Sequence, residues 1–238
     1  MSFRSYLYAD KVDINDQIYI RIPSVGEVMS DEEGYYALVQ ILTAMPIDLM
    51  CQLDDYGIDF TTIDDYELFL LLFPGICSQN TNMIFGDLDL KQFKLATNEK
   101  NGTTVLYNSK DDIVIDRAIH DKIADILRTI HHLEKDTRKP GNKEAQKYMI
   151  DRAKKKLKRE RDKVRTSQLE PLIISMVNTE QYKYNFATTR DLSIYQFNES
   201  VRQIINKVDY DNRMHGVYAG TVSIKDLSQD DLNWIVHK

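Results

Sequence analysis

Apolar positions in the first part of the chain change from strand-like to helix-like spacing. Residues 18–22 alternate apolar and polar side chains, which predicts a half-buried strand. From Ser30 the apolar residues recur at helical spacing, and Ser30 followed by Glu33 matches the capping box of a helix start. Two further helices are expected over 47–56 and 63–73, because each run is followed by glycine or proline.

The middle of the chain has short apolar runs separated by turn residues, which is typical of a small antiparallel sheet. Strands are expected at 83–85, 93–96, 105–107 and 113–115, with a hairpin loop at 98–102. Asp116 is the expected N-cap of a helix over 117–134, in which isoleucine and leucine recur at helical spacing.

A break with the sequence TRKPG, residues 137–141, divides the chain, because Pro140 restricts the residue before it and Gly141 adds freedom. The predicted fold class is α+β, predominantly helical. The expected regions are an acidic N-terminal α+β region at 1–136, a hinge at 137–141 and a helical C-terminal region at 142–238. Its helices are expected over 142–165, 167–178 and 191–208, with a short closing helix at 232–235.

Charge is distributed unevenly between these regions. Residues 1–90 contain 16 acidic and 3 basic residues, a net charge of −13. Residues 142–165 contain 11 basic and 4 acidic residues, a net charge of +7, in a chain whose total is −6. Because surface charge governs association rather than fold, this separation predicts charged partners, or contacts between opposed charge blocks of two copies.

The basic helix expected over 142–165 is the candidate partner-binding element. Its narrow apolar seam consists of Ile150, Ala153 and Leu157. The bases expected to bind a partner are Lys147, Arg152, Lys154, Lys155, Lys156, Lys158, Arg159 and Arg161. Such a face fits an acidic protein surface or, alternatively, nucleic-acid phosphates. Tyr148 is the single aromatic residue in the run. The nucleobases of a single strand would therefore find no series of aromatic rings to stack on, which favours a protein partner.

Sequence patterns of catalysis and metal binding are missing. The best acidic pairs, Asp54-Asp55 and Asp64-Asp65, lie at predicted helix ends, where aspartate commonly serves as a cap. The five histidines form no H-E-x-x-H motif, and the chain has neither a glycine-rich phosphate loop nor a nucleophile elbow. We therefore expect no enzymatic activity, no metal and no cofactor. The two cysteines lack C-x-x-C spacing and are expected to be reduced.

The chain shows no pattern that predicts a membrane association. Its start lacks the basic and apolar stretches of a secretory signal, and its longest apolar block, residues 68–77, is about half of the roughly 20 residues that span a bilayer. A cytoplasmic protein without membrane contact is expected. The single tryptophan, Trp234, is expected to dock onto the domain or, alternatively, to serve as an aromatic anchor for a partner.

Two C-terminal segments resemble a known group of proteins. LSIYQFNESVRQI, residues 192–204, and MHGVYAGTVSIKDLSQDDLNWI, residues 214–235, are similar to the C-terminal halves of small proteins encoded among the tail genes of phages that infect Gram-positive bacteria. The resemblance implies a tail assembly chaperone that binds the tape-measure or tail-tube protein, or a minor tail structural protein. It implies a location in the host cytoplasm or in the virion, and it provides no catalytic residue.

The chaperone interpretation agrees with the physical pattern of the chain. A tape-measure protein is a long, partly apolar helix that must stay soluble before the tail tube closes around it, so its helper needs helices with modest apolar seams and a charged exterior. The expected function is therefore non-enzymatic phage tail morphogenesis. A nucleic-acid-binding protein that uses residues 142–165 and a minor virion structural protein are the alternatives.

Overall fold

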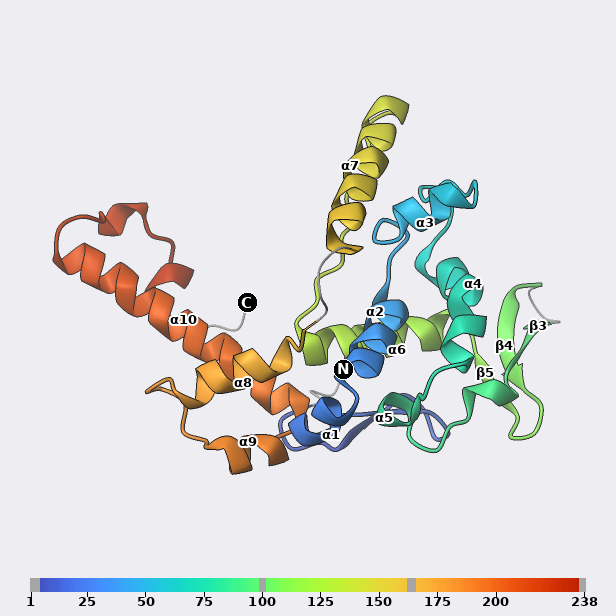
Figure 1. The fold of residues 1–238 in the computed structure, drawn as a ribbon, viewed down its shortest axis with the longest axis horizontal. Coiled ribbons are helices and arrows are strands. Elements are labelled where there is room, and N and C mark those ends of the chain that lie inside the picture. Colours follow the sequence, from blue (N-terminus) through green and yellow to red (C-terminus); the bar gives the residue numbers. More distant parts are fainter. Residues whose placement is uncertain (1–4, 99–101, 162–165, 236–238) are drawn as a thin grey trace.

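The computed structural model describes residues 5–98, 102–161 and 166–235. Within these ranges the fold is predominantly helical α+β, as predicted, with ten α-helices and two small antiparallel sheets (Figure 1). The strands are β1 (Lys11–Asp13), β2 (Tyr19–Arg21), β3 (Lys94–Thr97), β4 (Thr104–Asn108) and β5 (Ile113–Ile115). The helices are α1 (Val25–Ser30), α2 (Glu32–Thr43), α3 (Met50–Asp55), α4 (Asp65–Cys77), α5 (Asn82–Phe85), α6 (Arg117–His131), α7 (Lys143–Arg161), α8 (Leu169–Val177), α9 (Phe186–Asp191) and α10 (Ile194–Tyr218).

The two sheets confirm most of the predicted strands. In the β3-β4-β5 sheet, Leu95, Leu106 and Ile115 lie opposite one another. The expected strand at 83–85 is wrong, because these residues lie in α5, which is followed by the C-cap Gly86 with a φ of 59°. A three-residue apolar run carries no period that separates a strand from a helix turn, so packing decides the outcome. Of the expected hairpin loop at 98–102, residues 99–101 lie outside the described ranges.

The first helical segment begins earlier than the sequence prediction placed it. Ser24 is the N-cap of α1, and its hydroxyl and the Glu27 carboxylate form a complete capping box. The predicted N-cap, Ser30, is instead the last residue of α1, and the Asp31 side chain caps α2. The capping box at Ser24 was readable as S-x-x-E, but it lacks a long apolar run behind it.

Helix α4 passes through the residues that were expected to end it. Pro74 and Gly75 lie inside α4, exposed to solvent, while Phe73 and Ile76 on either side of them are buried. A proline costs a helix one hydrogen bond, and here the buried neighbours offset that loss. The expected end at Phe73 is therefore wrong by one turn.

The C-terminal half agrees with the prediction in outline. Asp116 caps α6 as expected, and Pro171 lies in the first turn of α8. The expected basic helix corresponds to α7, and residues 162–165 of that prediction lie outside the described ranges. The helix predicted over 191–208 corresponds to α10, but a capping box of Ser193 and Gln196 starts that helix three residues later, and it continues to Tyr218. The short helix α9 before it was not predicted.

One apolar core includes residues from both sides of the predicted hinge at 137–141. Ile130 of α6, Leu169 of α8, and Ile194 and Phe197 of α10 all lie in it. Backbone hydrogen bonds tie the start of α10 to the N-terminal region, since the Val25 amide donates to the Leu192 carbonyl at 2.8 Å. The first turns of α10 are therefore fixed in the body of the protein.

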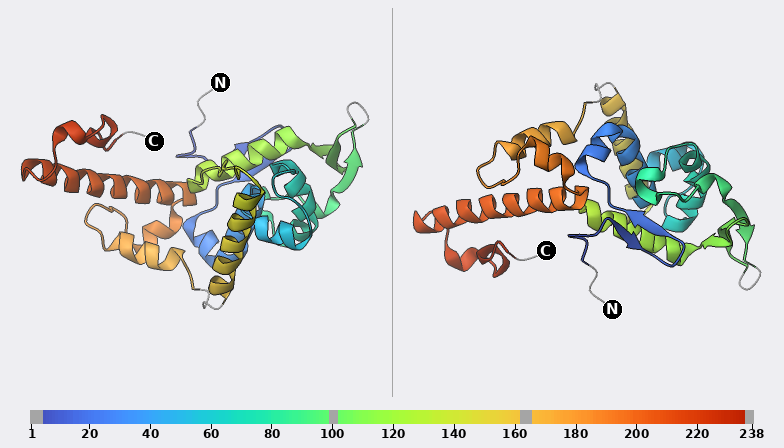
Figure 2. Two further views of the ribbon diagram at one scale, coloured as in Figure 1. Left: turned by 90° about the horizontal axis from the view of Figure 1, so that it is seen from above. Right: turned by 90° about the horizontal axis from the view of Figure 1, so that it is seen from below.

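Two long helices lie at the edges of this body. Helix α7 packs against α3 over a second, smaller apolar cluster, and α10 extends away from the remaining helices (Figures 1 and 2). The chain after α10 contains two short 3-10 turns, η2 (Ile224–Asp226) and η3 (Asp230–Leu232), and folds back beside that helix. None of the helices in the described ranges combines the length and apolar character needed to span a bilayer.

Candidate protein-binding surface on helix α7

The predicted apolar seam of α7 faces the body of the protein. Ile150 is buried with 9% of its surface exposed, and Ala153 and Leu157 on the same side are half-buried. Ile150 contacts a small cluster that includes Leu53 of α3 and Phe60. Because this contact is intramolecular, the seam holds α7 in place and does not present an open surface.

One predicted base of α7 also serves the intramolecular contact. The Lys154 ammonium donates to Asp54 Oδ2 at 2.6 Å and to Asp55 Oδ1 at 2.7 Å. These two hydrogen bonds, that to Asp54 first, raise the pKa of Lys154 above its usual value. The aspartate pair that was the best sequence candidate for acid or metal chemistry is thus one side of an ion pair, and no group of metal-ligating side chains occurs among the described residues.

The N-terminal turns of α7 have further polar ties to α3 and the loop after it. Gln146 donates from Nε2 to Asp59 Oδ1 at 2.6 Å, and the Cys51 thiol lies 3.8 Å from the Ile150 carbonyl oxygen. Hydrogen bonds from Thr61 are the main reason that the pKa of Asp59 is lowered. Burial raises the pKa of the Cys51 thiol, which disfavours its reactive thiolate form.

The opposite side of α7 is a basic stripe. Tyr148, Arg152, Lys155 and Arg159 are spaced by four, three and four residues, which places them on one helix face. All four are exposed, and Tyr148 keeps 67% of its surface in solvent. Within the described ranges, the three bases of this stripe make no ion pair or side-chain hydrogen bond. The basic stripe is therefore available to a partner.

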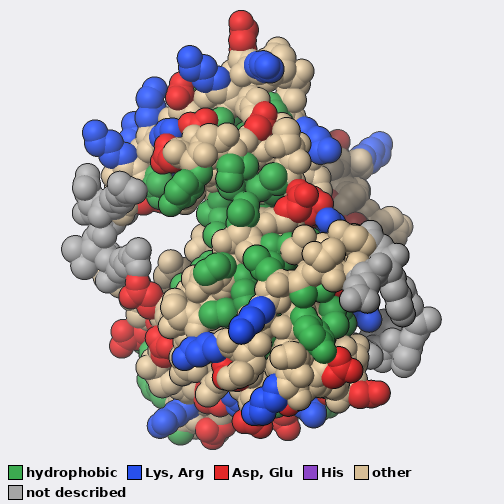
Figure 3. All heavy atoms as spheres, turned by 90° about the vertical axis from the view of Figure 1, so that its right-hand side faces the viewer, with side chains coloured by type: hydrophobic (Ala, Val, Ile, Leu, Met, Phe, Trp, Pro, Cys, Tyr) green, Lys and Arg blue, Asp and Glu red, His purple; other side chains and the backbone are tan. Residues whose placement is uncertain are grey.

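The remaining predicted bases flank this stripe. Lys147 and Lys158 are exposed, and Lys156 lies 3.8 Å from Glu160 on the next turn. The Arg161 side chain lies outside the described part of the chain. Seen from the side, Lys and Arg side chains gather around the upper end of the molecule, where α7 stands (Figure 3).

Trp234 lies against α10, half-buried. The Lys207 ammonium is 5.8 Å from the centre of the Trp234 ring and 5.9 Å from that of Tyr210, so one cation contacts two aromatic faces. Asp231, three residues before Trp234, forms an ion pair with Arg213 of α10. These contacts hold the C-terminal segment against the helix.

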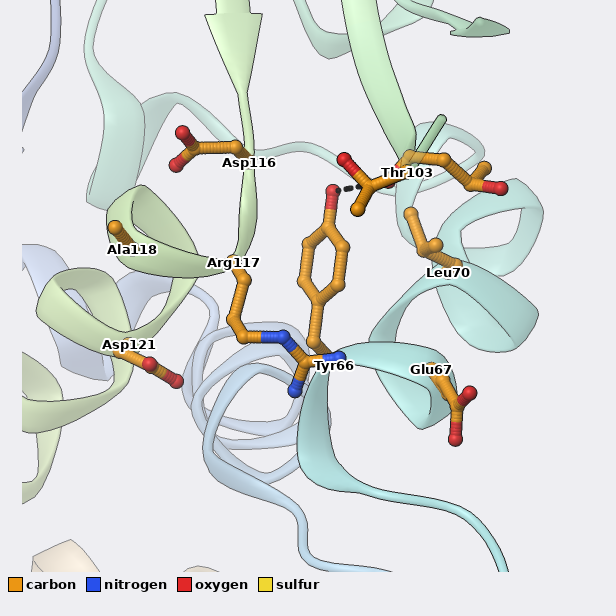
Figure 4. A pocket seen from close by; sticks show the side chains of 9 residues that line it. Tyr66, Glu67, Leu70, Thr103, Asp116, Arg117, Ala118 and Asp121 are labelled. Atoms are coloured by element: carbon orange, nitrogen blue, oxygen red, sulfur yellow. Dashed lines mark hydrogen bonds between the residues drawn. The ribbon is translucent and has the colours of Figure 1, made fainter. Parts of the chain in front are cut away.

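A hollow of about 540 Å³ lies between α4, the start of α6 and the residues before β4 (Figure 4). Tyr66 donates from its hydroxyl to the Ile115 carbonyl at 2.9 Å, and Arg117 binds Asp64 at 2.7 Å. The acids on its rim also have structural tasks: Asp116 caps α6 and Glu67 completes the cap of α4. Tyr66, Arg117, Asp116 and Glu67 thus contribute to holding the helices or their ends in place.

Comparison with known proteins adds one finding to this geometry. Residues 158–237 match the family described as YomV second domain. This family is phage-derived, and the match supports a phage protein. The matched region begins in the last turn of α7 and includes α8, α9, α10 and the segment that carries Trp234. Both C-terminal segments that resembled phage tail-gene products lie inside it. Comparison with curated proteins and with solved structures gives no match.

Proposed function

We propose that this phage-associated protein is a non-enzymatic morphogenesis factor, a tail assembly chaperone that binds the tape-measure or tail-tube protein through the basic stripe of α7. The observation that carries the proposal is that the two sides of this helix have different contacts. Ile150 and Lys154 fasten α7 to the body, while Arg152, Lys155 and Arg159 remain unpaired in solvent among the described residues. A rigidly held helix with a row of free cations is suited to bind an acidic surface.

The exposed position of the stripe also fits a reversible contact. Charges at a solvated surface raise the rate of association and are screened by salt, but each contributes little to affinity. A chaperone must release its client when the tail tube closes, so a contact dominated by exposed charge is appropriate. A stable structural contact would instead require a large apolar surface, and the apolar seam of α7 is already covered.

Binding to the purified tape-measure and tail-tube proteins of the same phage tests the proposal. We expect one of them to bind the wild-type protein, and the triple variant Arg152→Glu, Lys155→Glu, Arg159→Glu to bind at least about tenfold more weakly, because three attractive contacts become repulsive. A matched control, Lys91→Glu, Lys94→Glu and Lys110→Glu, makes the same change in net charge on exposed residues outside α7 and should bind as the wild type does.

A nucleic-acid measurement addresses the alternative. A short duplex and a single strand are titrated at two salt concentrations, with the same two triple variants. Tight binding with a steep salt dependence, lost in the α7 variant alone, would replace the chaperone function with nucleic-acid binding, because each neutralised phosphate releases counterions. Weak binding that is equal in both variants leaves the protein partner as the explanation.

A further inference from the structure

The distal part of the chain, residues 205–235, has no buried side chain. We call it the distal arm; it comprises the outer half of α10 and the segment that folds back on it (Figure 2). Its large apolar side chains that face solvent are Ile205, Val208, Tyr218, Ile224, Leu232 and Ile235. A segment of this size that encloses no core gains little from folding alone, so its exposed apolar residues indicate a contact surface.

The returning segment covers part of α10, and apolar residues of that helix remain exposed. It lies over Tyr210 and Arg213, and Gly216 permits close approach, since a Cβ there would come within 2.8 Å of Val222. Ile205 and Val208 of the same helix are 54% and 38% exposed. They continue the stripe whose earlier members, Val201 and Ile204, pack against the core.

The charge of the distal arm is opposite to that of α7. Residues 205–235 contain five acidic and three basic residues, a net charge of −2, whereas residues 143–161 contain nine basic and three acidic residues, a net charge of +6. Asp209, Asp226 and Asp230 are exposed and make no ion pair with any described residue. The arm thus offers three free carboxylates, and the basic stripe offers three free cations.

We propose that the distal arm docks on the basic stripe of α7 in a second copy of this chain. The arm and α7 leave the body in different directions, so the contact joins two molecules rather than two parts of one (Figure 1). Tyr148 and the exposed apolar side chains of the distal arm supply the uncharged part of the contact, and the free carboxylates and bases align it. Because the two surfaces differ, the contact is head to tail and produces rings or open chains.

The contact shares the α7 stripe with the proposed client site, but it requires no client and is tested on the protein alone. Sedimentation velocity of the full chain over a range of concentrations should show association that weakens at high salt. The stripe variant, Arg152→Glu, Lys155→Glu, Arg159→Glu, and the arm variant, Asp209→Lys, Asp226→Lys, Asp230→Lys, should each be monomeric. Mixed in equal amounts they should associate again, because each arm then meets an α7 of opposite charge.

The mixing step keeps the test decisive, since a misfolded variant cannot restore association. A wild-type protein that stays monomeric at about 100 µM, or a stripe variant that associates as the wild type does, overturns the proposal. Loss of client binding in the arm variant, with self-association unchanged, would assign the arm to the client instead. Failure of the client measurement alone leaves the head-to-tail contact standing, so the two proposals fail separately.

Discussion

Helix α7 and the distal arm are both at the edge of the molecule, but they are held in different ways. Helix α7 buries Ile150 against a cluster under α3 and adds the ion pair of Lys154 with two aspartates. The distal arm is held by Arg213, Lys207 and the half-buried Trp234, and none of its side chains is buried. The difference shows that a highly charged helix can be firmly docked, while a helix with more apolar residues can stay open to a partner.

The largest effect is expected at the N-terminal end of α10, which we call its root and which packs in the main core. Phe197 is fully buried, and Phe197→Ala should lower the free energy of unfolding by about 3–5 kcal/mol, because the cavity adds to the lost burial. Urea denaturation followed by far-UV circular dichroism measures this loss. Ile205→Ala, two turns further along the same helix, is the control and should change stability by no more than about 0.5 kcal/mol. Equal losses in the two variants would remove the distinction between root and arm.

The dependence of the free energy of unfolding on acid pH should also arise in the body of the protein. Burial is the main cause that lowers the pKa of His120 and of His131 to about 4 in the folded protein, and His131 Nε2 lies 2.9 Å from the Tyr35 hydroxyl oxygen. In the unfolded chain both histidines have the ordinary pKa of about 6.5, so above that pH they are neutral in both states and do not lower the free energy of unfolding. Below it the unfolded chain is protonated first, so the free energy of unfolding decreases as the pH falls towards 4. We expect a loss of about 2 kcal/mol per histidine between pH 7 and pH 5.

Urea denaturation at both pH values, repeated for His131→Gln, checks this slope. The glutamine can still bond to the Tyr35 hydroxyl, but it does not titrate, so the variant should lose about half of the pH dependence that the two histidines cause. A slope that is unchanged in the variant would mean that His131 titrates alike in the folded and unfolded states.

Docking of α7 is a smaller effect. Ile150→Ala should lower the free energy of unfolding by about 1–2 kcal/mol, less than a substitution in the main core, because its cluster is small and lies at the edge of the protein. Amide hydrogen exchange should increase along α7 more than in α6. Tyr148→Ala, on the solvent side of the same helix, is the matched control and should leave exchange in α7 unchanged. Equal exchange in both variants would show that the apolar seam does not hold the helix.

The sequence was most informative where local chemistry and packing agree. Asp116 as a cap, the strand at 113–115 and the long basic helix could all be predicted, because each rests on a pattern that the core then reinforces. Packing overrode the local signal at Pro74, where buried neighbours extend the helix through a proline. The start of α10 was placed at Asp191, two residues before its N-cap Ser193, although the S-x-x-Q capping box was readable, and the short helix α9 was missed.

The candidate site could be predicted in composition but not in orientation. The bases and the seam of α7 were identifiable from helical spacing alone. Which bases stay free depends on the partner of the seam, and that partner, α3, lies about 100 residues earlier in the chain. Contacts between segments so far apart leave no periodic mark, so the ion pair of Lys154 with Asp54 and Asp55 was not foreseeable. The exposure of the distal arm could not be predicted either, because the apolar stripe of its helix resembles that of a buried helix.

The smallest free-energy difference should be the opening of the distal arm, and the single tryptophan makes it measurable. Trp234 reports on the arm alone, whereas far-UV circular dichroism reports mainly on the helices of the body. At low protein concentration the tryptophan emission should change at a lower urea concentration than the dichroism, because the arm has no core and opens independently. Coincident transitions would show instead that the arm unfolds cooperatively with the body. At concentrations where copies associate, docking should raise the emission midpoint, since a ligand that binds the closed arm stabilises it. The stripe variant of α7 should not show this rise in the emission midpoint, because it lacks the basic surface on which the arm of a second copy docks.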